Sequence, residues 1–129
     1  MADRRANYAL VPFQDHLGRN EESLGVPWAD FVGDETPTYE FEVPAADPAD
    51  AYVELQAYDV GEYGHDICVN GTPLTGFDIP PADGWQYWMD TMSGVDLTES
   101  ENTIRIERDT STADAFVVGV VTVHWRERV

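Results

Sequence analysis

The densest group of side chains with binding chemistry is aromatic. Trp85, Tyr87 and Trp88 follow one another closely, beside Gln86 and Asp90. Aromatic rings flanked by amides and carboxylates can form a stacking platform for a sugar or a hot spot for a protein contact. The same rings could also fill a core, although period-two alternation places Trp85 and Tyr87 on one face of a strand and Trp88 on the other. We expect at least one of the three to be exposed, and covered by a protein neighbour rather than a sugar.

A second group combines carboxylates with a histidine. Asp59, Glu62, His65 and Asp66 lie in one predicted loop, and together they could ligate a hard cation or a transition metal. Their spacing matches neither an EF-hand nor an HExxH motif. With 25 acidic residues in 129, such clusters also arise by chance. We therefore predict no metal site and no cofactor.

Nucleophilic chemistry finds little support. Cys68, the only cysteine, lies in the apolar run Ile67–Val69 next to Asp66. A reactive thiol needs a positive neighbour, so we expect Cys68 to be a core residue. The serines lack a G-x-S-x-G setting, and the carboxylates are too numerous for a glycosidase pair to be singled out. The sequence predicts no catalytic residue and no enzyme activity.

The charge balance is extreme. The chain carries 25 Asp and Glu against seven basic residues, all of them Arg, for a formal charge of −18. At molar salt the Debye length shrinks to about 3 Å, which removes most of the self-repulsion. Lysine-free, carboxylate-rich surfaces resemble those of haloarchaeal proteins; an acidic mesophilic interaction protein is the alternative. The same charge disfavours nucleic acid as a partner, because phosphate binding needs clustered Lys or Arg.

The sequence shows neither the pattern of a membrane-spanning segment nor that of a signal peptide. No run approaches the ~18 apolar residues of a membrane span. Arg4 and Arg5 are not followed by an apolar stretch of the kind found in signal peptides. We therefore expect no signal peptide, no membrane partner, and a location in the cytoplasm or in a virus particle assembled there.

The elements that must position these residues are predicted strands. Apolar and polar residues alternate at period two along several segments, which is typical of half-buried strands. Phe116–Val123 is apolar on both faces, as expected of a central strand. Asn70-Gly71 is a strong signal for a hairpin turn. Trp85–Met92 fits a strand better than a helix. The alternating segments are Thr38–Val43, Ala51–Tyr58 and Asn102–Arg108.

These strands predict an all-β, antiparallel β-sandwich of the jelly-roll type. The chain has no alternating helices and no linker, so we expect a single domain over residues 1–129. Residues 1–37 are less regular: Tyr8–Phe13 reads as a short strand, with Pro12 favouring an edge, and Gln14–Leu24 as a polar stretch with one helical turn.

One stretch resembles a known superfamily. Val69-Asn70-Gly71 is followed by Pro73-Leu74, and later by Asn102-Thr103-Ile104-Arg105-Ile106. This order resembles the galactose-binding-like jelly-roll domains, in which a V-N-G hairpin precedes a G-x-N-x-I-x-I return strand. Glu99-Ser100-Glu101 replaces the usual glycine before Asn102. The chain also resembles small haloarchaeal proteins of unknown function, some of them proviral. The superfamily is mostly non-catalytic and includes sugar-binding and assembly domains, among which the fold does not choose.

The sequence therefore predicts a non-catalytic structural or assembly protein of a haloarchaeon or its virus, such as a virion or complex component. Its partners would be proteins, in a homo-oligomer or a larger assembly. The alternative is a carbohydrate-binding jelly-roll module with a glycan ligand. In either case Trp85, Tyr87 and Trp88 are the candidate binding residues.

Overall fold

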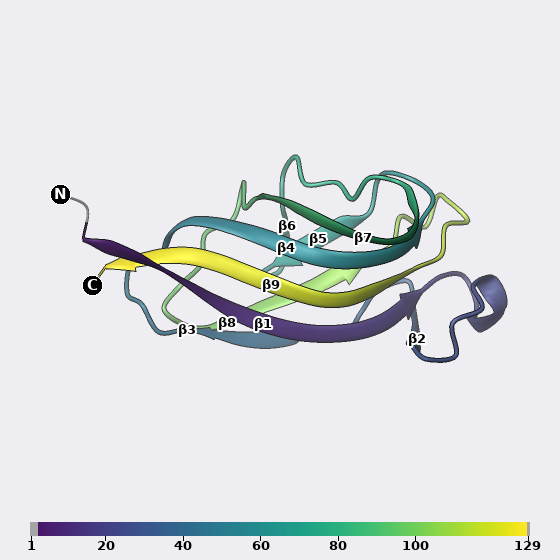
Figure 1. The fold of residues 1–129 in the computed structure, drawn as a ribbon, viewed down its shortest axis with the longest axis horizontal. Helices are drawn as coiled ribbons and strands as arrows, with labels where there is room; N and C mark the ends of the chain where they lie inside the picture. Colours follow the sequence, from purple (N-terminus) through teal and green to yellow (C-terminus); the bar gives the residue numbers. More distant parts are fainter. Residues whose placement is uncertain (1–2, 129) are drawn as a thin grey trace.

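The computed structural model describes residues 3–128, which form two β-sheets packed face to face (Figure 1). The five-stranded sheet has the order β2-β1-β9-β4-β7, and the four-stranded sheet the order β3-β8-β5-β6. A single 3-10 turn, η1 (Glu21–Ser23), follows β1. The strands are β1 (Arg4–Leu17), β2 (Asp30–Gly33), β3 (Tyr39–Val43), β4 (Ala49–Val60), β5 (Asp66–Val69), β6 (Thr72–Pro73), β7 (Ala82–Thr91), β8 (Ser100–Glu107) and β9 (Phe116–Arg128).

The predicted all-β sandwich of the jelly-roll type is confirmed. Every strand pair is antiparallel except β1 with β2. The predicted central strand is also confirmed, because β9 lies between β1 and β4 in the larger sheet. In residues 3–128 no helix has the length and apolar character needed to cross a membrane.

The core lies between the two sheets and follows from the alternation. Val53 and Leu55 of β4 point inward and are fully buried, as predicted. They face apolar side chains of the smaller sheet, and burial of each such side chain contributes about 1.5–3 kcal/mol. Further core residues are Val11, Phe13, Phe41, Val43, Ile67, Val69, Ile104, Ile106, Val121, Val123 and Trp125.

The N-terminal strand is longer than the sequence predicts. Tyr8–Phe13 was the expected strand, whereas β1 extends from Arg4 to Leu17 and pairs along its length with β9. A bulge before Asp15, where Gln14 has φ 56°, shifts the alternation and hides the second half of the strand. Pro12 is compatible with this position because β2 pairs only with residues 15–17, which leaves Pro12 on a free edge.

The predicted hairpin at Asn70-Gly71 is confirmed. Both residues have positive φ, 52° and 83°, and they connect β5 to β6. The Asn70 side chain also bonds to Asn102, at 2.9 Å, and accepts the Thr103 backbone N–H. The two asparagines that carry the family resemblance therefore hold the turn against β8, which is a structural role.

Candidate binding face

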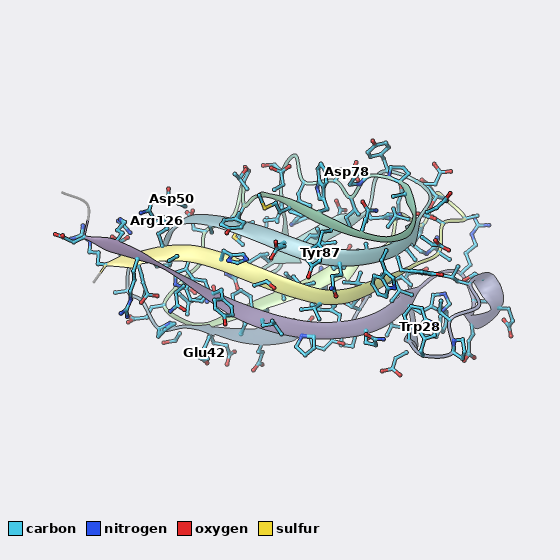
Figure 2. The ribbon with its side chains drawn as sticks, in the orientation of Figure 1. Trp28, Glu42, Asp50, Asp78, Tyr87 and Arg126 are labelled. Carbon is cyan, nitrogen blue, oxygen red and sulfur yellow. The ribbon has the colours of Figure 1, made fainter. Side chains whose placement is uncertain are left out.

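The outer face of the five-stranded sheet is formed by cross-strand rows of outward side chains. Tyr8 of β1, His124 of β9, Tyr52 of β4 and Thr91 of β7 are paired in one row. The Tyr52 and His124 rings are stacked, with centroids 4.3 Å apart. The next rows contain Leu10, Thr122, Glu54 and Met89, and then Pro12, Val120, Gln56 and Tyr87. Figure 2 shows Tyr87 and Trp28 on this face.

Four aromatic residues at one end of these rows form what we call the aromatic platform: Trp28, Tyr58, Trp85 and Tyr87. The Trp85 ring lies 5.2 Å from Tyr58 and 5.7 Å from Trp28, measured between centroids. Trp28 meets Tyr58 edge to face at 5.4 Å. These distances fall in the range of favourable aromatic pairs, so the rings support one another although three separate segments supply them.

Gly119 makes room for Trp85. A side-chain Cβ at position 119 would lie 3.1 Å from Trp85 Cζ3 and 2.9 Å from Gln56 Oε1. The Trp85 indole therefore extends from β7 across β4 to the surface of β9. Near Gly119, β9 pairs irregularly with both of its neighbours, with β4 at Gln56 and with β1 at Gln14. The local backbone of β9 thus accommodates the ring.

Amide groups surround the platform. Gln56 Nε2 donates to Tyr87 Oη at 3.1 Å, and the backbone N–H of Val120 donates to Gln56 Oε1. Gln86 Nε2 donates to the Pro80 carbonyl at 2.7 Å. Gln56, Trp85, Gln86 and Tyr87 line a shallow hollow of about 120 Å³. Flat aromatic surface and fixed hydrogen-bonding groups therefore occur together on a rigid sheet.

The prediction that at least one of Trp85, Tyr87 and Trp88 is exposed is confirmed. Trp85 is 50% exposed and Tyr87 68% exposed. Trp88 points the other way and packs against the core, as the alternation indicates. Its indole Nε1 is buried without a hydrogen-bond partner in residues 3–128. Trp88 is therefore not part of the exposed surface. The binding role of Trp85 and Tyr87 stays a prediction.

The platform continues into a wider apolar surface. Of the eight large hydrophobic side chains exposed in the described chain, six lie on this face: Tyr8, Leu10, Trp28, Trp85, Tyr87 and Met89. Aromatic side chains have about 150–250 Å² each, so the partial exposure of these residues places several hundred Å² of apolar surface here. Patches of that size on monomers are often functional.

A larger cavity of about 600 Å³ opens where β4 begins and β7 ends. Tyr52 and Met89 connect it to the outer face, and Met92, Val95 and Leu97 supply further apolar walls. Its carboxylates are Asp50, Asp90 and Asp96.

The acidic loop serves the structure instead of gathering around an ion. His65 Nδ1 accepts the Asp109 backbone N–H at 2.9 Å, so Nε2 carries the proton that is donated to Asp114 at 2.7 Å. Asp114 also accepts the backbone N–H groups of Gly61 and Glu62. Asp59 bonds elsewhere and accepts the Gly84 N–H at 2.6 Å. Across residues 3–128, no three His, Cys, Asp or Glu side chains are placed to hold a metal ion.

A serine and a histidine do meet near η1, but with the wrong polarity for catalysis. Ser23 Oγ donates to the Asn20 carbonyl at 2.6 Å and lies 3.4 Å from His16 Nε2. With its proton directed to Asn20, the hydroxyl can only accept from His16. Burial lowers the pKa of His16. Cys68 is buried as predicted, and burial raises its pKa to about 11.

Sequence reasoning missed Trp28, Tyr58 and Gly119. Tyr58 follows from the alternation along β4, which places Tyr52, Glu54, Gln56 and Tyr58 on one face. Trp28 lies in an irregular loop, and its place beside Trp85 depends on the fold.

The comparisons with known proteins agree with this architecture. The family model described as "Family of unknown function (DUF7383)" matches residues 5–127. No curated protein matches the chain. Among solved structures, the CBM36-1 domain of a multidomain xylanase from the hindgut metagenome of Trinervitermes trinervoides has a TM-score of 0.56 at 12% identity. That match covers 91% of this chain and 96% of the xylanase domain.

Two larger proteins contain a similar domain. The Podospora anserina GH26-CBM35 β-(1,4)-mannanase has a TM-score of 0.57 at 12% identity over 90% of this chain. Dimeric latent PorU from Porphyromonas gingivalis has the same score and identity over 99% of this chain. The matched region is 27% of the mannanase and 13% of PorU. At this identity the likeness shows a shared fold, that of carbohydrate-binding-module domains.

Proposed function

The chain belongs to the family of unknown function DUF7383, and we propose that it is a non-catalytic domain that binds carbohydrate through the aromatic platform. The observation that carries this proposal is the exposure of Trp85 and Tyr87 on the outer face of the sheet, beside the Gln56 amide. Sugar rings stack on aromatic faces through their C–H groups, while amides bond to their hydroxyls. The platform offers both kinds of contact within one hollow.

Two further observations support the carbohydrate reading. The similar domains in the xylanase and the mannanase are named as carbohydrate-binding modules, so the fold is compatible with this task. The Ser23–His16 pair has the polarity opposite to that of a nucleophile and its base. This pair therefore gives no support for a serine nucleophile, and we propose binding without bond cleavage.

The test is a glycan array probed at molar KCl, including mannan and xylan, followed by titration with quenching of tryptophan fluorescence. Trp85→Ala should weaken the binding of any hit at least about tenfold, equivalent to about 1.4 kcal/mol. Tyr63→Ala is the matched control, since Tyr63 is exposed to 60% in a loop and stacks with none of the platform rings in the described chain. An array without a hit, or equal losses in both variants, would contradict the proposal.

The second candidate function is a structural or assembly role, including that of a virion or complex component in a haloarchaeon or its virus. The observation favouring it is the apolar surface beyond the platform, where Tyr8, Leu10 and Met89 are exposed. A protein interface needs about 800 Å² from each partner, and this face offers a large share of that area. Under this hypothesis, the parent protein would bind no glycan on the array. Trp85→Ala would weaken its complex with a protein partner.

A further inference from the structure

One long sheet edge in the described chain, that of β7, is unguarded. Among the strands at the ends of the two sheets, β2 has four residues, β3 five and β6 two. The part of β1 that β2 leaves unpaired is also a free edge, but it carries Arg4, Arg5 and Pro12. β7 has ten and pairs only with β4 (Figure 1). Proteins usually protect a long edge with lysine, proline or strong twist. Ala82–Thr91 contains neither lysine nor proline, and its segment from Trp85 to Met89 is uncharged.

The hydrogen-bonding direction along β7 can be assigned. The Met92 backbone N–H donates to the Ala51 carbonyl at 2.9 Å, and the pairing of Tyr52 with Thr91 continues this register. In an antiparallel ladder, alternate residues direct their backbone groups to the same neighbour. Position 92 directs its groups to β4, so Trp85, Tyr87 and Met89 direct theirs away from it.

These outward groups have no backbone partner in the described chain. No backbone hydrogen bond within residues 3–128 joins the free side of 85–89 to another segment. The Thr91 N–H, which faces the same way, bonds to the adjacent Asp90 carboxylate at 2.7 Å. The side of β7 that carries the aromatic residues is therefore ready to accept a further strand.

We infer that the occupant is a second copy of this chain, whose β7 pairs antiparallel with the first around Tyr87. In this register Trp85 lies opposite Met89 of the second copy, and Asp90 opposite Gly84. No carboxylate faces another carboxylate across the pair, so the strand is compatible with itself. The pairing would form about six hydrogen bonds and join two five-stranded sheets into one.

The charge of the chain sets the conditions for this dimer. Each copy carries −18, so association at low ionic strength opposes strong repulsion. At molar salt the Debye length of about 3 Å removes most of that repulsion. The two aromatic platforms would then lie next to each other on one continuous sheet. The inference goes beyond the carbohydrate proposal and does not depend on it.

Light scattering after size exclusion in 3 M KCl tests the dimer directly. The expected mass is twice the 14.4 kDa of the chain. Met89→Pro should give the monomer mass, because it removes an N–H that points away from β4 and leaves the β4 ladder intact. Met89→Ala is the control and should stay dimeric. A monomeric parent at 3 M KCl, or a Met89→Pro protein that is folded by circular dichroism and still dimeric, would overturn the inference.

A cysteine trap tests the register and does not depend on proline. In the proposed pairing the two copies of residue 87 lie directly opposite each other, with Cβ atoms about 5 Å apart. Tyr87→Cys should therefore form a disulfide dimer under mild oxidation at least tenfold faster than Tyr63→Cys. The native Cys68 is buried and contributes little to either reaction. Equal rates in the two variants would contradict the inference.

The two proposals fail separately. Met89→Pro should lose the dimer and keep glycan binding, since Trp85 and Tyr87 remain in place. Trp85→Ala should lose glycan binding and keep the Tyr87→Cys crosslink when the two substitutions are combined. Loss of both properties in Met89→Pro would show that dimer and platform are one site, contrary to the inference.

Discussion

The two outer faces of the sandwich differ sharply in charge. At the paired outward positions of β1, β9, β4 and β7 in the described chain, Glu54 is the only carboxylate. The outer face of the four-stranded sheet, which we call the acidic face, presents Glu40, Glu42, Asp66, Glu101 and Glu107. Arg105 is the one cation among them and pairs with Glu107. Asp78 and Glu42 lie away from the labelled aromatic residues in Figure 2.

The contrast shows that the −18 charge is not spread evenly. Solubility at high salt asks only for many surface carboxylates, and any exposed strand position could supply one. We take the low number of carboxylates at the paired positions of these four strands as support for the proposed binding face. The acidic face has the carboxylate-rich character expected of a solvent-facing surface in so acidic a protein.

The largest expected effect is that of salt concentration on the stability of the fold. Stability should rise by several kcal/mol between dilute buffer and molar KCl, because screening relieves repulsion among the carboxylates. That corresponds to an increase of Tm on the order of 10 °C or more, measured by circular dichroism melts. A Tm that stays flat or falls with salt would contradict adaptation to high salt.

A charge variant sharpens this experiment. The triple change Glu40→Gln, Glu42→Gln and Glu101→Gln removes three charges from the acidic face. It should lower the salt concentration needed for folding and leave platform binding unchanged. A loss of binding in this variant would mean that the two faces do not act separately.

Two glycines should separate stability from binding. Gly71 has φ 83° with no atom near a Cβ position, so Gly71→Val should cost more than about 1 kcal/mol through backbone strain alone. At Gly119 the obstacle is contact with Trp85 and Gln56, so Gly119→Val should displace the indole and abolish platform binding, with about 1–3 kcal/mol lost to overpacking. Urea unfolding and fluorescence titration of both variants measure the two effects. If Gly71→Val bound less tightly under conditions in which it is fully folded, the two glycines would not separate stability from binding.

Much of the fold follows from local pattern. Apolar and polar residues alternate strictly along β3, β4 and β8, and the Asn70-Gly71 dipeptide is typical of a hairpin turn. These three strands and this turn could therefore be predicted from their own residues. The second half of β1 could not, because the bulge at Gln14 interrupts the alternation. Asp83-Gly84 is a dipeptide typical of turns, yet it lies inside β7, where Gly84 has φ 72° at the irregularity opposite Asp59.

The candidate site was predictable only in part. Alternation along β7 separates Trp85 and Tyr87 from Trp88, but it does not say which side is the core. That is decided by the second sheet, which covers Trp88. Trp28 and Gly119 come to Trp85 from distant parts of the chain, and no local signal in the sequence connects them.

The smallest effect on stability is expected from a carboxyl group in the interior, between the two sheets. Asp15 is buried, and burial raises its pKa above the ordinary value of 3.8, against the opposing hydrogen bond from Tyr39 at 2.6 Å. The folded protein therefore holds the Asp15 proton more tightly than the unfolded chain does. This contribution to stability is present below pH 3.8 and is lost as the pH rises through the folded pKa.

Asp15→Asn should remove this pH dependence and stabilise the protein at neutral pH, by about 1 kcal/mol or less. Unfolding in urea at pH 4 and at pH 7 measures it for the parent and the variant. Glu127 offers a control of opposite sign, because hydrogen bonds from Asn7 and Trp125 lower its pKa. An unchanged pH slope in Asp15→Asn would show that another group is responsible.

The antiparallel pairing of Arg4 with Arg128 brings the first and last strands together at one end of the sandwich (Figure 1). Tension applied between these two residues would load the β1–β9 hydrogen bonds one after another, like a zipper, instead of all together in shear. The domain should therefore yield at low force when it is stretched through its own ends. Trp85 lies toward the far end of the same sheet, so the proposed binding site is distant from the strand ends that such a force would separate.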